Sequence, residues 1–143
     1  MSVRSILDQK GLQVFTIDQG AGIEQAAELM RERNIAALPV TKSGEVVGML
    51  TSRDIVDGLA RHGSHLFSLR AADLMRRDFA RVSPADSARQ VMTLMTRRRM
   101  THIPVFSSGQ LVGIVSIGDV VKHRLEDLEI ETNVLRDVYI AAH

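Results

Sequence analysis

The sequence contains one short pattern twice. "GMLTSRD" occupies Gly48–Asp54 and "GIVSIGD" occupies Gly113–Asp119. Both have a glycine, two apolar residues, a small hydroxyl residue, two further residues and an aspartate. Sliding the chain by 65 residues aligns 14–57 with 79–122 without a gap, and twelve of the 44 aligned pairs are identical. An internal repeat of this kind predicts one structural unit built twice.

Each copy predicts the same order of elements: strand, helix, strand, strand, helix. Apolar residues at helical spacing predict the first helix of each copy, and Ser83-Pro84 is a plausible start for the second copy's helix. Two apolar runs joined by a short turn containing Ser-Gly predict a β-hairpin in each copy. The expected first strands are "LQVFTI" (12–17) and "FARV" (79–82), and the expected first helices are "GIEQAAELMRERN" (22–34) and "SARQVMTLMTRRR" (87–99).

The repeat divides the chain into five segments. Neither copy alone, at about 45 residues, would bury enough surface to be stable, so we expect two α/β halves packed sheet to sheet around a pseudo-twofold axis. The apolar spacing of the last segment predicts a long C-terminal helix. The segments are an N-terminal helix or arm (1–13), the first repeat (14–61), a linker helix (62–78), the second repeat (79–125) and a helical tail (126–143).

The composition excludes several classes of protein. Hydrophobic residues make up 45% and charged residues 24%, with a formal net charge of +1, so no overall field draws the chain to nucleic acid or to a membrane. The absence of cysteine excludes disulfides, thiolate metal sites and cysteine nucleophiles. No apolar run approaches the roughly 20 residues of a membrane helix, and the start lacks a signal core, so we expect a soluble cytoplasmic protein.

The hydroxyl-to-aspartate step has two possible meanings. Thr51 and Ser116 stand where a helix would begin, and a helix N-terminus attracts anions such as phosphate. Asp54 and Asp119 follow three residues later, where a carboxylate could accept hydrogen bonds from the two hydroxyls of a ribose. The alternative is a capping box, which has the same spacing. Recurrence at equivalent positions favours a nucleotide ligand.

The repeat resembles a tandem pair of cystathionine-β-synthase (CBS) domains, a Bateman module of the stand-alone prokaryotic type. The resemblance is carried by "NIAALPVTKSGEVVGMLTSRDIV" (34–56) and "RMTHIPVFSSGQLVGIVSIGDVV" (99–121), and it covers about residues 5–125. It implies that AMP, ADP, ATP, S-adenosylmethionine or NAD(H) binds in clefts between the two repeats, and that binding regulates another protein.

The resemblance also implies which residues form the two sites. The family's hydroxyl and ribose-binding positions fall on the two Thr/Ser-x-x-Asp steps, and its adenine-contacting segment falls before each Pro-Val pair. Each cleft would combine the helix start of one copy with the strand of the other. One site would contain Thr51, Arg53, Asp54, Thr101 and His102, and the other would contain Ser116, Gly118, Asp119, Ala36 and Ala37.

The two expected sites differ in charge. Arg53 could pair with a phosphate, whereas Gly118 at the equivalent position has no side chain. We therefore expect weaker phosphate binding at the second site, with His102 as a partial substitute while it is protonated. Arg97-Arg98-Arg99 is expected at a solvated helix end, although Arg99 could also reach a phosphate.

Other histidines give weaker signals. His62 and His65 are three residues apart in a Gly/Ser-containing linker without a further ligand nearby, so we expect no metal site. His123 lies in a mixed series of charges and is expected to face solvent.

We expect a regulatory adenine-nucleotide-binding module that senses energy or redox state and signals to a partner protein. Nothing in the sequence supplies a catalytic group with its partners, so we do not expect an enzyme or a catalytic cofactor. The alternatives are a structural interaction module with vestigial clefts and an unrecognised nucleotide-using enzyme. A homodimer is expected, because a single module would expose the apolar stripe of the tail.

Overall fold

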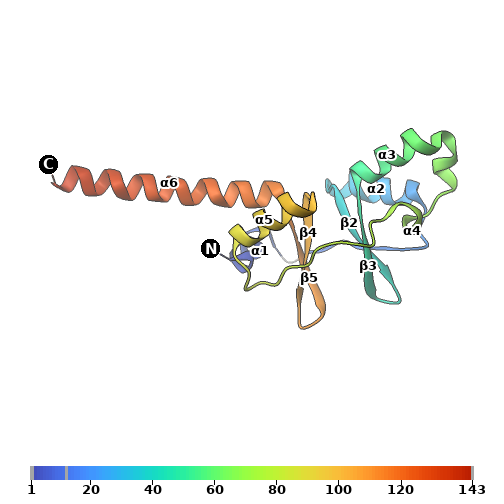
Figure 1. The fold of residues 1–143 in the computed structure, drawn as a ribbon, viewed down its shortest axis with the longest axis horizontal. Helices are drawn as coiled ribbons and strands as arrows, with labels where there is room; N and C mark the ends of the chain where they lie inside the picture. The colour runs from blue at the N-terminus through green and yellow to red at the C-terminus, as the bar shows by residue number, and fades with distance from the viewer. Residues whose placement is uncertain (1, 12, 143) are drawn as a thin grey trace. The chain divides into compact units, whose positions relative to one another are not determined.

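The computed structural model describes residues 2–11 and 13–142, and they form a mixed α/β fold with two small sheets (Figure 1). The chain divides into two compact units. The first-repeat unit comprises residues 13–80, and the second-repeat unit comprises residues 1–12 together with 81–143. The expected fold class, with two equivalent repeats and a long C-terminal helix, is confirmed.

The first-repeat unit contains a three-stranded sheet in the order β1-β2-β3. Strand β1 is parallel to β2, and β2 is antiparallel to β3. A buried apolar cluster that includes Ile23, Leu38 and Leu50 joins the sheet to its helices. The elements are β1 (Ile17–Asp18), α2 (Ile23–Arg33), β2 (Ala37–Lys42), β3 (Glu45–Thr51), α3 (Ser52–His62), the 3-10 helix η1 (Gly63–Ser68) and α4 (Ala71–Leu74).

The second-repeat unit contains a two-stranded antiparallel hairpin with helices around it. Its C-terminal helix is a single element of 26 residues, which joins the second helix of the repeat to the expected tail. The elements are α1 (Val3–Lys10), α5 (Ala88–Arg98), β4 (His102–Ser107), β5 (Gln110–Ser116) and α6 (Ile117–Ala142). None of the helices among the described residues is long and apolar enough to cross a membrane.

Both hairpins close through the Ser-Gly pair that recurs in the sequence. Ser43 and Gly44 have φ angles of 52° and 82°, and Ser108 and Gly109 have φ angles of 51° and 76°. Positive φ at both central residues defines the turn that matches the twist of a two-residue hairpin. The predicted hairpins are therefore confirmed, and the recurrence of Ser-Gly has a backbone cause.

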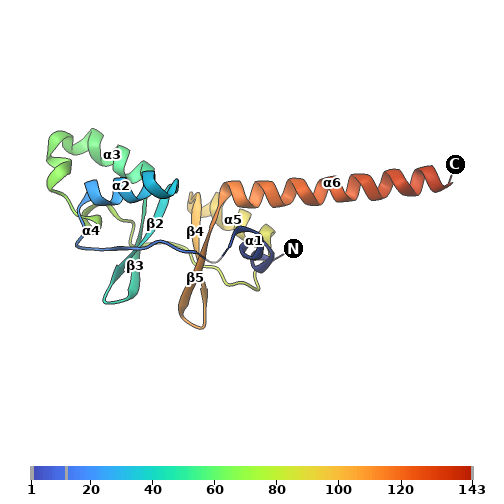
Figure 2. The ribbon, with the colours of Figure 1, turned by 180° about the vertical axis from the view of Figure 1, so that it is seen from behind.

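Helix α1 packs on the second repeat in the way that α4 packs on the first. The Val3 N–H donates to the Asp86 carbonyl at 2.8 Å, and the Ala71 N–H donates to the Ala21 carbonyl, also at 2.8 Å. Figure 2 shows α1 beside β5 in its own unit. The N-terminal segment is thus part of the second-repeat core.

Glycine allows these two helices to approach the strands closely. A Cβ on Gly113 would stand 2.6 Å from Leu7 Cδ2, and a Cβ on Gly48 would stand 2.5 Å from Met75 Sδ. A side chain at either glycine would force Leu7 or Met75 to move, and at Gly48 it would also press on the Arg76 carbonyl oxygen at 3.1 Å. The glycine of the repeated motif therefore has a packing role.

Two local strand expectations are wrong, and the start of one expected helix is defined more closely. Residues 79–82 form no regular strand, because only an isolated parallel bridge joins Val82 to Val105. The strand expected over 12–17 is shorter and lies at Ile17–Asp18, while Leu12 lies outside the described residues. Helix α5 lies within the expected range 87–99, and Ser87 rather than Ser83 caps it: the Ser87 hydroxyl accepts from the Gln90 N–H at 3.1 Å, and the Gln90 side chain accepts from the Ser87 N–H at 2.7 Å.

His123 does not face solvent as expected. Its exposed fraction is 6%, and no hydrogen-bond partner is found for either ring nitrogen within the described part of the chain. It lies three residues after Val120, which is 1% exposed, so both belong to the face of α6 that covers the core. Helical position decided its burial, although its sequence neighbours are charged.

Candidate functional site

In the first-repeat unit, the expected adenine segment lies beside the start of α3. Ala37 in β2 pairs with Thr51 at the end of β3, and the Ser52 N–H donates to the Ala36 carbonyl at 2.9 Å. Strand pairing thus places Ala36, Ala37 and Thr51 together. We call this set, with Arg53 and Asp54, the first half-site.

The second-repeat unit repeats this arrangement. His102 in β4 pairs with Ser116 at the end of β5, and the Ile117 N–H donates to the Thr101 carbonyl at 2.8 Å. We call Thr101, His102, Ser116, Gly118 and Asp119 the second half-site. The expectation that one ligand contacts the helix start of one repeat and the strand of the other stays a prediction.

Both hydroxyl-to-aspartate steps form capping boxes. The Thr51 hydroxyl accepts from the Asp54 N–H at 3.2 Å, and Asp54 Oδ2 accepts from the Thr51 N–H at 2.9 Å. In the second repeat, the matching distances between Ser116 and Asp119 are 3.1 and 2.9 Å. The capping interpretation is therefore correct. It does not exclude a ligand role, because each box uses only Oδ2 and a carboxylate has a second acceptor oxygen.

The first half-site carries an exposed cation in the first turn of α3. Arg53 is exposed, and no ion pair or hydrogen bond is found for it among the residues described here. Gly118 occupies the equivalent place in α6 and offers backbone only. The expected difference in side chains is present, although its consequence for phosphate binding remains a prediction.

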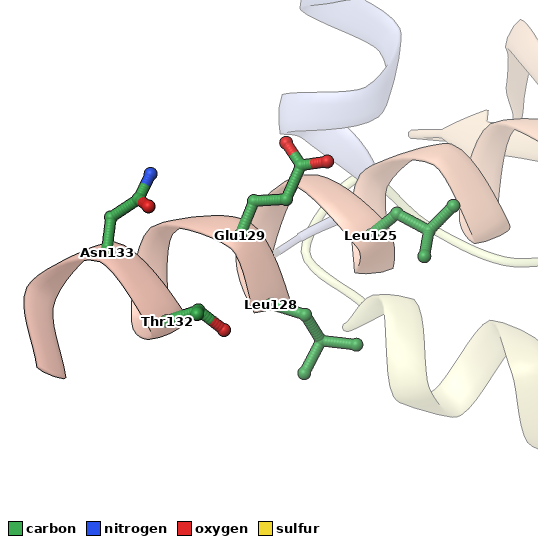
Figure 3. Close-up of a pocket in the computed structure, with 5 residues that line it drawn as sticks. All are labelled: Leu125, Leu128, Glu129, Thr132 and Asn133. Atoms are coloured by element: carbon green, nitrogen blue, oxygen red, sulfur yellow. The ribbon is translucent and has the colours of Figure 1, made fainter. Parts of the chain in front are cut away.

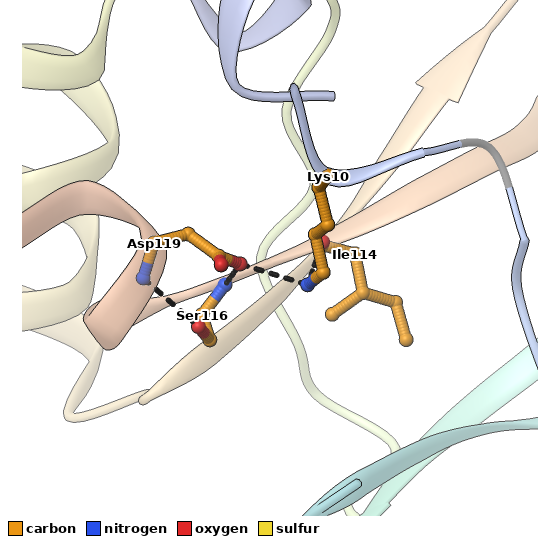
Figure 4. Close-up of polar contacts among 4 residues, drawn as sticks. All are labelled: Lys10, Ile114, Ser116 and Asp119. Carbon is orange, nitrogen blue, oxygen red and sulfur yellow. Dashed lines mark hydrogen bonds and ion pairs between the residues drawn. The ribbon is translucent and has the colours of Figure 1, made fainter. Parts of the chain in front are cut away.

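The second half-site contains a cation that the sequence did not indicate. Lys10, the last residue of α1, places Nζ 2.7 Å from Asp119 Oδ2 and 2.9 Å from the Ile114 carbonyl oxygen (Figure 4). Its position follows from the packing of α1 on β5, and 109 residues separate it from Asp119. No local pattern could have joined these two residues.

Lys10 also changes the acidity of Asp119. Partial burial raises the pKa of Asp119, but the hydrogen bond from Lys10, the N–H of Ser116 and the charge of Lys10 outweigh this effect. The pKa of Asp119 is therefore below its ordinary value. The carboxylate stays ionised and is already paired with a cation.

His102 is a poorer cation than expected. Desolvation lowers the pKa of His102 most, the positive charge of Lys10 lowers it further, and the negative charge of Asp119 opposes both. Its Nδ1 lies 2.9 Å from the Thr101 hydroxyl. A His102 with a lowered pKa is mostly neutral at pH 7, so Lys10 is the persistent positive charge of the second half-site.

The other candidates lie at the end of α5 and around η1. Arg97 and Arg98 lie in the last turn of α5 and Arg99 follows it, where cations complement the helix dipole. His65 is hydrogen-bonded to Ser68, and its ring centroid is 6.4 Å from that of His62. No group of three or more potential metal ligands occurs among the described residues.

Comparisons with known proteins agree on one family. A family model for the CBS domain matches residues 3–61 and 71–126. The CBS domain-containing protein YhcV of Bacillus subtilis is 29% identical over 123 residues, which cover 86% of this chain and 87% of YhcV. The chain spans smaller parts of two other curated relatives, 21% and 51% of their lengths.

Solved structures show the same fold. The CBS-domain protein ATU1752 of Agrobacterium tumefaciens matches with a TM-score of 0.84 and 36% identity, over 87% of this chain and 99% of that chain. The CBS domain pair of protein MJ0100, solved in complex with 5'-methylthioadenosine and S-adenosyl-L-methionine, matches with a TM-score of 0.79 and 24% identity, over 89% and 98%. Because the family model matches each of the two repeats, this chain belongs to the CBS-domain family as a tandem CBS pair.

Proposed function

We propose that this chain is a regulatory module that binds an adenosine-containing ligand, such as AMP, ADP, ATP or NAD(H). The observation that supports the proposal most is that the same constellation is built twice. In each repeat, strand pairing holds the strand segment before the Pro-Val pair beside a helix start that carries a hydroxyl and an aspartate, although Ala37 of the first segment is only 4% exposed. Capping alone does not require the strand segment, whereas a nucleotide needs a place for its base as well as for its ribose.

The chemistry of each half-site fits one part of such a ligand. Backbone N–H groups and the dipole at the start of α3 or α6 attract phosphate. The carboxylate of Asp54 or Asp119 accepts from ribose hydroxyls. Ala36 and Ala37 in the first half-site, and Thr101 and His102 in the second, would contact the adenine.

The two half-sites differ in the cation that each offers to a phosphate. Arg53 has a planar guanidinium that can donate two hydrogen bonds to one phosphate. Lys10 is a point charge whose ammonium is shared with Asp119. We therefore propose that the first half-site prefers a di- or triphosphate and that the second prefers a ligand with less phosphate charge.

The module acts on another protein and catalyses no reaction itself. Thr101 and His102 bring a hydroxyl within 2.9 Å of an imidazole nitrogen, but among the described residues no further hydrogen bond orients the His102 ring, as a catalytic base would need. The fold itself can hold adenosine derivatives, because the MJ0100 pair was solved with two of them. We propose that the functional form is a homodimer and that ligand occupancy changes its affinity for a regulated partner.

Mass spectrometry of small molecules released from the purified, denatured protein tests the proposal. The expected result is an adenosine-containing compound that is present in wild type and depleted in Asp54→Ala. Retention of the compound by Asp54→Ala and by Asp119→Ala would contradict the site assignment. Conversion of added nucleotide to a new product would favour an enzyme instead.

A further inference from the structure

The C-terminal part of α6 has no covering element in its own unit. Every described residue from Leu128 to Ala142 is exposed, and Figure 1 shows the helix continuing beyond α1 and α5 of the same unit. Six of these exposed residues are large and apolar beyond Leu128 itself: Ile130, Val134, Leu135, Val138, Tyr139 and Ile140. Large apolar residues exposed together mark an interaction site, and Leu128, Leu135 and Tyr139 lie on one side of the helix.

One stripe of α6 follows a heptad pattern. Its core positions alternate by four and three residues along the helix, which is the spacing of a two-stranded coiled coil. They are Val121, Leu125, Leu128, Thr132, Leu135, Tyr139 and Ala142. Val120 and His123, which cover the core of the unit, point to other sides of the helix, so the stripe faces outward.

A shallow hollow on this stripe is lined by residues at the spacing that such pairing uses. Leu125, Leu128, Glu129, Thr132 and Asn133 line it (Figure 3). The first four stand at i, i+3, i+4 and i+7, which is the four-residue hole that receives one side chain from a facing helix in knobs-into-holes packing. In a parallel pair in register, the knob for this hole is Leu128 of the partner subunit.

The charges beside the stripe select the orientation. In a parallel pair, the residue immediately before Leu125 or Thr132 on one helix lies beside the residue five positions later on the other helix. Arg124 then faces Glu129 of the partner subunit, and Glu131 faces Arg136 of the partner subunit. Both pairs have opposite charges.

An antiparallel pair centred on Ile130 brings like charges together. Glu129 and Glu131 would each face their own copies, and Lys122 would face Arg136 of the partner subunit. Like charges at these flanking positions are repulsive. An antiparallel pair shifted by one heptad toward the C-terminus forms only the two symmetry-related Glu129–Arg136 pairs, fewer than the four of the parallel pair. We propose that α6 pairs with α6 of a second copy of this chain, as a parallel, in-register two-stranded coiled coil over Val121–Ala142.

Single cysteines test the geometry directly, because the natural chain has none. Thr132→Cys lies in the stripe and would face its own copy, within the reach of a disulfide. Ile130→Cys lies on the opposite side of the helix and serves as the matched control. Under mild oxidation, Thr132→Cys should give a covalent species of twice 15.8 kDa, and Ile130→Cys should remain a single chain. Equal cross-linking of the two variants, or none at position 132, would overturn the proposal.

A charge exchange tests the orientation without cysteine. Glu131→Arg should raise the dimer dissociation constant by at least about threefold at low salt, and adding Arg136→Glu in the same chain should restore it, because the interhelical pair is re-formed with reversed signs. Analytical ultracentrifugation measures both variants, and circular dichroism verifies their folding. A dimer that neither substitution affects would show that another face joins the two copies, and this result would contradict the coiled coil.

Discussion

Replacement of Asp54 separates the capping role of this carboxylate from a ligand role. Asp54 Oδ2 accepts from the Thr51 N–H at 2.9 Å, and a side-chain amide can accept the same hydrogen bond without a charge. Asp54→Asn should therefore keep the capping box, whereas Asp54→Ala should lose that acceptor. If the carboxylate also binds ribose, both variants should weaken adenine-nucleotide binding.

The expected magnitudes differ between stability and affinity. Loss of one half of a capping box at a partly buried helix start costs about 1 kcal/mol, or roughly 3 to 5 °C in Tm for a chain of this size. A hydrogen bond to a charged group contributes about 1.5–3 kcal/mol, so Asp54→Ala should raise Kd roughly tenfold to a hundredfold. Asp54→Asn keeps a neutral acceptor and should raise Kd by less, about threefold to tenfold.

Isothermal titration calorimetry gives Kd, and thermal melts give Tm. Asp73 provides the matched control, because Asp73 Oδ2 accepts from the Arg70 N–H at 2.8 Å at the start of α4, which reproduces the carboxylate half of the box outside the two half-sites. Asp73→Asn should leave Kd unchanged. If Asp54→Ala lowers Tm while both Asp54 variants bind like wild type, the aspartate is only a cap and the ribose assignment is wrong.

Four further substitutions test other parts of the account. Lys10→Met should raise the pKa of both Asp119 and His102, which nuclear magnetic resonance titration measures; unchanged values would show that the Lys10–Asp119 pair does not form in solution. Because the pKa of folded His102 is below 6.5, the unfolded chain binds more protons just below that pH. Wild-type stability should therefore rise with pH through this window and level off above about 6.5, and His102→Gln should flatten the rise in Tm between pH 5.5 and 7.5. Gly48→Ala should destabilise the protein by about 1–3 kcal/mol in urea unfolding because of its close contacts. Gly118→Ala should be neutral or stabilising, since the nearest atom is 3.6 Å away. Equal effects of these two glycine substitutions would contradict the packing argument.

Local chemistry explains why much of the fold could be predicted. The Ser-Gly turns need positive φ at both central residues, and this requirement is visible in the sequence. Thr51 begins α3 because its hydroxyl accepts from an N–H three residues later, again within one turn. The range of α5 was predicted, but its capping residue was not, because Ser83 and Ser87 are both suitable caps. Gln90, three residues after Ser87, was the available signal.

Long-range packing explains what could not be predicted. Lys10 meets Asp119 only because α1 packs on β5, and nothing near either residue indicates the other. His123 was assigned to solvent from its charged neighbours, although its spacing from Val120 carried the correct signal. The half-site residues could be identified from the repeat, whereas the cation of the second half-site required the fold.

A calorimetric titration of the purified full chain with AMP, ADP, ATP and NAD, with GMP as the control for the base, tests the central claim most directly. The account predicts saturable binding of at least one adenine ligand at micromolar to millimolar concentration, with markedly weaker binding of GMP and a loss of affinity in Asp54→Ala. No saturable heat for any adenine ligand, or equal binding of GMP and AMP that Asp54→Ala leaves unchanged, would contradict it.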